Sequence, residues 1–248
     1  MDRKADRESG ELLARIQDAA VRAQRSDRPV FTRFLNPAQI AQATAHVKKS
    51  GLEIGSFGGY HTAERRMMCL SPFEVTDYPI ACLSVISTDG SVRSHRDYLG
   101  ALLNLGLDRE CLGDIVVREK DALVFCIDTI APFLTMELTR VGSSVVRTQE
   151  VDIAALSVER KTAVSTATVS SLRLDCVVAA FAHLSRTDSA TLITRGLVQV
   201  NYQVCEKSAA SLSDGDTLSV RGHGKFVLHV SDRLSKKGRI HIQMEQYI

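Results

Sequence analysis

The chain has 248 residues, of which 44% are hydrophobic and 24% charged, and its net charge is +2. This length is enough for one large domain or two ordinary ones, and the composition excludes a disordered chain, which would combine low hydrophobicity with high net charge. So small a net charge argues against a uniformly basic nucleic-acid-binding protein, although a whole-chain sum can hide a local basic patch.

Aromatic residues and cysteines narrow the function further. Aromatic residues make up 5% of the chain and Trp is absent, so the stacking of many bases on an aromatic platform is not expected to dominate. The six cysteines contain no CxxC pair and have no His at ligand spacing, which argues against a zinc site. A phosphate-cradling glycine loop is also absent. We therefore expect no metal and no cofactor.

The amino terminus begins Met-Asp-Arg-Lys, without an apolar signal segment, and no run of about 18 apolar residues occurs in the chain. The sequence therefore predicts a soluble protein that does not associate with a membrane. The cysteines are predicted to behave as small buried hydrophobic residues, which is typical of proteins in a reducing compartment. We therefore expect a cytoplasmic location.

Residues 1–76 are predicted to form a mainly helical segment. Apolar side chains recur every three or four positions between Leu12 and Ala23, as on one face of a helix. Asn36 and Pro37 are typical of the start of a second helix, and Gly51 should end it. The later Gly-Gly-Tyr-His-Thr-Ala-Glu-Arg-Arg stretch is either a functional loop or a turn between a strand and a helix.

Residues 77–156 are predicted to form a ferredoxin-like plait. The expected elements follow the order β-α-β-β-α-β, with ranges 78–87, 97–107, 115–118, 122–127, 130–141 and 145–151. This order gives a four-stranded antiparallel sheet with two helices on one face. The central strands contain Phe125 as their only aromatic residue, which disfavours base stacking on the sheet. The plait therefore binds either RNA, through loops and charges, or protein.

Residues 157–170 are rich in Ser, Thr and Val and are predicted to be a linker or an extended strand. Beyond them, residues 171–248 are predicted to form a small separate domain. It opens with two short helices, the second capped by Ser185, and continues with short strands and an Asp-Gly-Asp turn. The expected fold class is α+β: an N-terminal helical segment with a ferredoxin-like plait, followed by this C-terminal domain.

The C-terminal segment resembles the α-L RNA-binding domain found in the fourth small-subunit ribosomal protein. The matching residues, in order and spacing, are Arg173-Leu174-Asp175, Ser185-Arg186, Ala190, Ile193, Gly196, Val198, Val200-Asn201 and Asp214-Gly215-Asp216. In that family two short helices and the following β-turn form one surface that fits a structured RNA backbone. The resemblance therefore implies that residues 171–248 bind RNA.

The distribution of charge agrees with this assignment. Residues 172–248 carry ten basic and seven acidic side chains, a net charge of +3, whereas residues 1–171 have a net charge of −1. Basic side chains that neutralise phosphates release counterions, and Arg can contact two phosphate oxygens at once. The expected RNA-binding residues are Arg173, Ser185, Arg186, Thr187, Arg195, Asn201, Lys207, Arg221, Lys225, Lys236, Lys237 and Arg239. Asp175 is expected to be structural, as a helix-start cap or a partner of Arg173.

The N-terminal part is similar to the YlmH family. The residues that carry this similarity are Gly-Gly-Tyr-His-Thr-Ala-Glu-Arg-Arg at 58–66, Ser-His-Arg-Asp-Tyr-Leu-Gly-Ala-Leu-Leu-Asn-Leu-Gly-Leu at 94–107, and Arg109-Glu110 to Gly113-Asp114-Ile115. Ser94 is a mild departure, because Thr or another small polar residue is expected there. The similarity extends over nearly the whole chain from about Phe31.

The YlmH resemblance implies a non-enzymatic, ribosome-associated RNA-binding protein. Its implied partners are the large ribosomal subunit, large-subunit rRNA, peptidyl-tRNA and a nascent-chain tailing factor. The implied role is to hold peptidyl-tRNA while a stalled chain is extended with alanine. Off the ribosome the protein is expected to be a monomer. We interpret Arg65, Arg66, His95 and Arg96 as a second contact surface, for RNA or for ribosomal protein.

Two other classes of function stay open. One is an RNA-modifying enzyme of the pseudouridine-synthase type, targeted by the α-L domain, since Arg173-Leu174-Asp175 resembles a motif in which Asp is the nucleophile. However, only about 73 residues follow Asp175, and the α-L fold uses them. The other is a cell-division-linked adaptor with incidental RNA affinity. A modifying enzyme should leave a changed nucleotide, and an adaptor should keep its partner after ribonuclease treatment.

Overall fold

We analysed a computed structural model of the chain, which describes residues 3–158, 162–235 and 238–247. The chain divides into two units, Met1–Val158 and Glu159–Ile248, and each is described by itself. Among the described residues, no helix is both long enough and apolar enough to cross a membrane.

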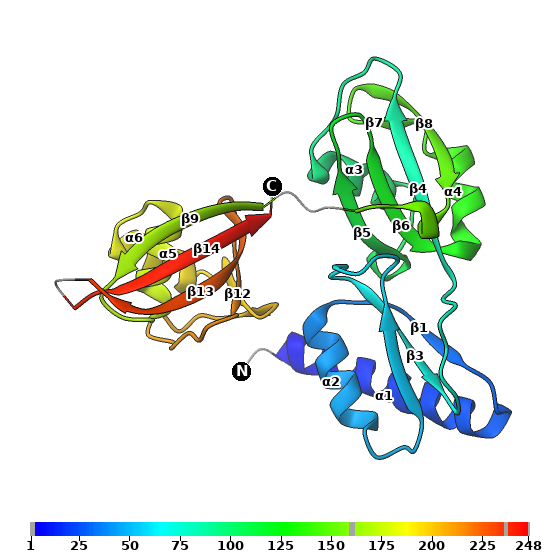
Figure 1. The fold of residues 1–248 in the computed structure, drawn as a ribbon, viewed down its shortest axis with the longest axis horizontal. Coiled ribbons are helices and arrows are strands. Elements are labelled where there is room, and N and C mark those ends of the chain that lie inside the picture. Colours follow the sequence, from blue (N-terminus) through cyan, green and yellow to red (C-terminus); the bar gives the residue numbers. More distant parts are fainter. Residues whose placement is uncertain (1–2, 159–161, 236–237, 248) are drawn as a thin grey trace. The chain divides into compact units, whose positions relative to one another are not determined.

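The first part of unit 1 packs two helices against a three-stranded antiparallel sheet (Figure 1). Its elements are α1 (Arg3–Ser26), β1 (Val30–Leu35), α2 (Pro37–Val47), β2 (Glu53–Phe57) and β3 (Arg66–Ser71), with strand order β1-β3-β2. The predicted cap of α2 is confirmed: Asn36 Oδ1 accepts from the Gln39 amide at 2.9 Å, and Gln39 Oε1 accepts from the Asn36 amide at 2.9 Å. The N-cap therefore satisfies backbone donors that the helix leaves unpaired.

The expectation of a mainly helical segment over residues 1–76 is incomplete, because three strands lie within it. Leu35 packs into the core beneath α1 and α2, whereas its neighbour Phe34 packs on the opposite side, against the plait. Likewise, Met67 to Leu70 of β3 are all buried. A strand that is buried on both faces loses the polar–apolar alternation that would reveal it in the sequence.

The second part of unit 1 has the predicted ferredoxin-like arrangement. Its elements are β4 (Ile80–Ser87), α3 (His95–Asn104), β5 (Leu112–Val117), β6 (Ala122–Ile127), α4 (Ala131–Glu137), β7 (Arg140–Val141) and β8 (Ser144–Val151), with short 3-10 turns at Arg109–Cys111, Asp128–Ile130 and Ile153–Ala155. The antiparallel sheet has the order β5-β6-β4-β8-β7. The second helix is shorter than predicted because residues 140–141 pair with β8 instead of continuing the helix.

Both faces of the plait sheet are covered. On one face α3 and α4 bury Tyr98 and Leu134 against the strands. On the other face the first part of unit 1 packs against Phe125, whose ring centroid lies 5.0 Å from that of Tyr60. Phe125 is fully buried, so its ring cannot stack on an RNA base.

The Gly58-Gly59 turn is set by this packing. Gly59 has φ +96°, and a Cβ on it would overlap the Phe125 ring. Gly59→Ala is therefore expected to lower the free energy of unfolding by about 2–3 kcal/mol. The matched control is Gly10→Ala, because Gly10 lies in α1 with open space around it and Ala is the better helix former. In urea denaturation only the Gly59 variant should lose stability, and an unchanged Gly59→Ala midpoint would contradict the packing described.

Unit 2 places α5 (Leu174–Ala182) and α6 (Arg186–Thr194) on one face of a six-stranded antiparallel sheet (Figure 1). The strands are β9 (Thr162–Val169), β10 (Val198–Val200), β11 (Gln203–Val204), β12 (Thr217–Val220), β13 (Gly224–Leu234) and β14 (Ile240–Tyr247), in the order β11-β10-β12-β13-β14-β9. Its core lies between helices and sheet, where Phe181 of α5 packs on Phe226 with ring centroids 4.0 Å apart.

The stretch expected to be a linker or extended strand contains β9, which pairs with β14 along its whole length. The division between the units accordingly falls after Val158, not near residue 171. β9 is an edge strand of the sheet, and its Val164 is 54% exposed. A Ser- and Thr-rich strand with one solvated face has little apolar signal, which is why its composition resembles that of a linker.

Candidate nucleic-acid interface

Two arginines at the starts of adjacent helices share one carboxylate in unit 2. Arg173 is the N-cap of α5, and Arg186 is the first residue of α6. Arg173 Nε donates to Asp175 Oδ1 at 3.1 Å, and its Nη2 donates to Oδ2 at 2.8 Å. Arg186 Nη2 donates to the same Oδ2 at 3.1 Å. We call Arg173, Asp175 and Arg186 the Asp175 clamp.

The clamp combines a buried anion with accessible cations. The Asp175 side chain is 8% exposed, whereas those of Arg173 and Arg186 are 44% and 62% exposed. Hydrogen bonding from Arg173, with a smaller contribution from Arg186, holds the pKa of Asp175 well below its usual range. The carboxylate is therefore ionised; it holds one edge of the Arg173 guanidinium, through Nε and Nη2, and a single nitrogen of Arg186, Nη2. The remaining N–H groups can donate to phosphate oxygens. The predicted structural role of Asp175 is consistent with these contacts.

The start of α6 is fixed by its own side chains. Ser185 Oγ accepts from the Asp188 amide at 3.1 Å and donates to Asp188 Oδ2 at 2.7 Å, so the predicted cap is confirmed. The buried Ser189 donates its hydroxyl to the backbone carbonyl of Asp175 at 2.9 Å, which ties α6 to α5. Thr187 is exposed in the first turn of α6. The Ser185 hydroxyl is thus occupied by the cap.

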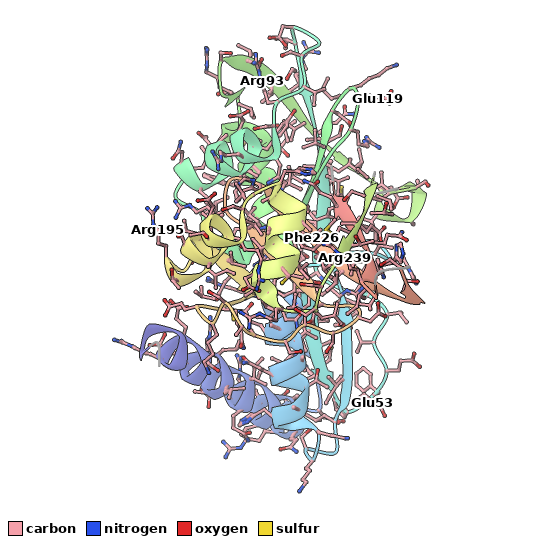
Figure 2. The ribbon with its side chains drawn as sticks, turned by 90° about the vertical axis from the view of Figure 1, so that its left-hand side faces the viewer. Glu53, Arg93, Glu119, Arg195, Phe226 and Arg239 are labelled. Carbon is pink, nitrogen blue, oxygen red and sulfur yellow. The ribbon has the colours of Figure 1, made fainter. Side chains whose placement is uncertain are left out.

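The other predicted RNA-binding cations are spread over unit 2. Exposed positions at the end of α6, after β11 and in the β12–β13 turn are occupied by Arg195 (Figure 2), Lys207 and Arg221. Arg239 is also exposed, and its Nη2 donates to the Thr168 carbonyl at 2.7 Å. Lys236 and Lys237 lie outside the described residues.

The hairpin turn between β10 and β11 contains Asn201 and Tyr202. Both residues have positive φ, 49° and 67°, as a two-residue type I′ turn requires. Asn201 Nδ2 donates to Asp216 Oδ1 at 2.8 Å, and its Oδ1 accepts from the Thr217 amide at 3.0 Å. Asn201, predicted to contact RNA, therefore joins this turn to the start of β12.

Tyr202 contacts a predicted RNA-binding cation, although the sequence analysis gave the tyrosine no role. Lys225 Nζ lies 4.3 Å from the centroid of the Tyr202 ring and donates to its hydroxyl at 3.1 Å. The Tyr202 side chain is half-buried. The signal that points to it is an aromatic residue at a turn position that Gly usually occupies.

Arg65 is not part of an exposed contact surface, which corrects the sequence-based interpretation. Its guanidinium donates to the backbone carbonyls of Phe34, Arg109 and Leu112 at 2.9, 3.3 and 3.0 Å, and burial lowers its pKa. These carbonyls belong to β1, the 3-10 turn at 109–111 and the start of β5. Arg65 therefore ties the two parts of unit 1 together.

The other members of the proposed second surface differ in their surroundings. The Arg66 guanidinium donates to the backbone carbonyls of Ala63 and His61 at 2.7 and 3.2 Å, so it stabilises the loop before β3. His95 and Arg96 are exposed in the first turn of α3. The four residues thus lie near the starts of two different elements, and of the four it is His95 and Arg96 that are exposed.

Asp114 is a buried acceptor that the sequence analysis did not assign. It is 5% exposed and accepts from the Tyr60 hydroxyl at 2.7 Å. It also accepts from the backbone amides of Glu64 and Arg65 at 2.8 and 3.1 Å. The loop 58–66 is thereby fixed to β5. It joins β2 to β3, so it is a turn between two strands and not the predicted turn between a strand and a helix.

All six cysteines are free thiols. Within the described ranges, no three His, Cys, Asp or Glu side chains form a group that could hold a metal ion.

Known proteins similar to this chain agree with the observed architecture. Residues 8–75 match the family model described as "YlmH, N-terminal", and residues 74–155 match "Putative RNA-binding domain in YlmH". The "Ribosome-associated protein quality control protein P2" of Bacillus subtilis strain 168 is 33% identical over 229 residues, covering 90% of this chain and 89% of that protein. The chain belongs to the YlmH family. The YlmH resemblance inferred from the sequence is thereby confirmed.

A solved structure gives a second comparison for this YlmH-family chain. "Cell division protein ylmH" from Streptococcus pneumoniae has a TM-score of 0.54 and 22% identity, and the match covers 59% of this chain and 93% of that one. At this identity the likeness concerns the fold alone. The two family models end at residue 155, within unit 1. The Bacillus relative matches more residues than unit 1 contains, so its similarity extends into unit 2.

Proposed function

We propose that this YlmH-family chain is an RNA-binding protein whose C-terminal unit, an α-L-type domain, binds a structured RNA backbone. The observation that carries this proposal is the Asp175 clamp, which holds two arginines together at the starts of α5 and α6. A guanidinium matches the geometry of phosphate oxygens, and two fixed guanidiniums match neighbouring phosphates better than two mobile ones.

One relative and one family model support the association with the ribosome. The Bacillus subtilis relative is named as ribosome-associated and as a quality control protein, and the family model over residues 74–155 is described as RNA-binding. We accordingly propose large-subunit rRNA and peptidyl-tRNA as the bound RNAs, in the cytoplasm. The proposed role is non-enzymatic support of alanine tailing on stalled chains, together with a tailing factor.

The geometry around Asp175 favours binding over RNA modification. Oδ1 accepts from Arg173, and Oδ2 accepts from both Arg173 and Arg186. A nucleophilic carboxylate would have to leave these partners before attacking a base. We therefore propose that Asp175 positions the arginines rather than reacting with RNA.

For the plait, we propose contacts on the side of its helices, since the sheet face that carries Phe125 is covered. The accessible α3 pair, His95 and Arg96, lies on this side. Arg96 lines a groove of about 490 Å³ together with Arg140 and Asn104, and the acidic Asp97 and Glu137 line it as well. A loss of ribosome binding in His95→Ala with Arg96→Ala would support this assignment, and unchanged binding would remove it.

Sucrose-gradient sedimentation of the full chain from lysate tests the proposed function. We expect the chain to migrate with free large ribosomal subunits at low salt and to dissociate as the salt concentration rises. A chain that stays at the top of the gradient would contradict the proposal. An adaptor would instead keep a protein partner after the RNA has been digested with ribonuclease.

A further inference from the structure

We infer that Tyr202 is a nucleobase-stacking residue, which the β10–β11 turn holds so that one unpaired RNA base can stack on its ring. This inference rests on the proposed RNA-binding function and deepens it. It adds a contact that does not depend on charge, and it identifies an unpaired nucleotide as part of the ligand.

The first support is the conformation of the turn. Tyr202 has φ +67°, a region that bulky residues rarely enter and that Gly adopts without steric cost. Backbone strain of this kind is concentrated at functional sites, where the surrounding structure maintains it. Here Asn201 maintains it through its hydrogen bonds to Asp216 and Thr217.

The second support is the side of the sheet on which the ring lies. Leu218 and Phe226 form a cross-strand pair in the core beneath α5 and α6. The next pair, Ser219 and Lys225, therefore points to the side opposite the helices, where both residues are partly exposed. Because Lys225 Nζ lies 4.3 Å from the ring centroid of Tyr202, the half-buried ring lies on this side of the sheet.

The third support is chemical. Every base has a π face, so one aromatic ring can stack on an unpaired nucleotide of any sequence. The ammonium of Lys225 adds positive charge beside the ring. The exposed Arg221 adds a second cation in the turn that leads into β13. A single ring fits one splayed-out base, which agrees with a chain that is poor in aromatic residues.

A substitution series separates stacking from packing. Tyr202→Gly relieves the strained backbone and removes the ring, whereas Tyr202→Phe keeps the ring. We expect Tyr202→Gly to bind purified large ribosomal subunits about 10-fold more weakly than the parent chain, with the same salt dependence and no decrease in Tm. Tyr202→Phe should bind as the parent chain does. Phe73→Ala removes an exposed aromatic from unit 1 and should leave binding unchanged.

The outcomes distinguish this inference from the proposed function. Failure of the parent chain to bind subunits would contradict the proposed function itself. If the parent binds and Tyr202→Gly binds equally well, the ring only packs on the sheet and the stacking role is overturned.

A second measurement does not require the glycine variant to fold. Because the chain has no Trp, Tyr202→Trp supplies a single fluorescent reporter. Its emission should be quenched when protein-free large-subunit RNA saturates the protein. Unchanged emission at saturation would also overturn the inference.

Discussion

Replacing both Arg173 and Arg186 with alanine is expected to weaken binding to large ribosomal subunits by at least about 10-fold. Affinity falls as the salt concentration rises, and this negative slope of log affinity against log salt should become shallower by about 2, because two phosphate contacts are lost. The Arg173 and Arg186 side chains are 44% and 62% exposed and extend from one buried carboxylate, so their removal takes away the proposed contacts together with the hydrogen bonds that they donate to Asp175. Co-sedimentation over a series of salt concentrations measures both quantities.

The matched control is Arg25→Ala with Arg28→Ala, which removes two exposed arginines from unit 1 and changes the net charge equally. This control should retain its affinity. Equal losses in the two double variants would show that net charge, rather than the Asp175 clamp, governs binding. An unchanged affinity and slope in the clamp variant would contradict the assigned interface.

Asp175→Asn is expected to weaken RNA binding severalfold even though it raises the net charge by one. Electrostatics alone predicts the opposite sign, because a more positive protein attracts phosphate more strongly. The expected loss arises because a neutral amide no longer fixes the two guanidiniums. The same change should lower the free energy of unfolding by about 2 kcal/mol, since charge-assisted hydrogen bonds are lost. Binding and urea denaturation measure the two effects.

The pKa of Asp175 gives this variant a pH signature. The pKa of Asp175 is lower in the folded protein than in the unfolded chain. The ionised Asp175 therefore stabilises the folded state fully above about pH 4. The stabilisation is lost as the pH falls through the folded value. Asp175→Asn should lack this component of acid sensitivity. Tighter binding by the variant would contradict the positioning role, and a pseudouridine that disappears in an Asp175→Asn strain would favour the modifying enzyme.

Much of the fold could be predicted because its signals are local. The caps at Asn36 and Ser185 and the β-α-β-β-α-β order depend on neighbouring residues and on apolar spacing. The sheet β1-β3-β2 could not be predicted, because Phe34 and Leu35 of β1 are buried on opposite faces and β1 shows no polar–apolar alternation. For β9 the sequence left two alternatives, a linker or an extended strand, because an edge strand with exposed Ser and Thr has too weak an apolar pattern to decide between them.

In the candidate site, too, contacts between residues close in the sequence could be predicted and contacts that depend on tertiary packing could not. A contact between Arg173 and Asp175 was foreseeable from two residues of separation, whereas the share of Arg186 in the same carboxylate depends on how α6 packs on α5. The hydrogen bonds of the half-buried Arg65 were not foreseeable, because its partners are carbonyls distant in the sequence. Tyr202 was passed over because its side chain is ordinary and only its backbone conformation is unusual.

The most direct test of the central claim is electron cryomicroscopy of particles purified with the full chain. We predict a free large ribosomal subunit with bound tRNA, on which the starts of α5 and α6 lie against an RNA backbone and Arg173 and Arg186 contact phosphates. A particle in which these helix starts face solvent, or contact only protein, would contradict the claim.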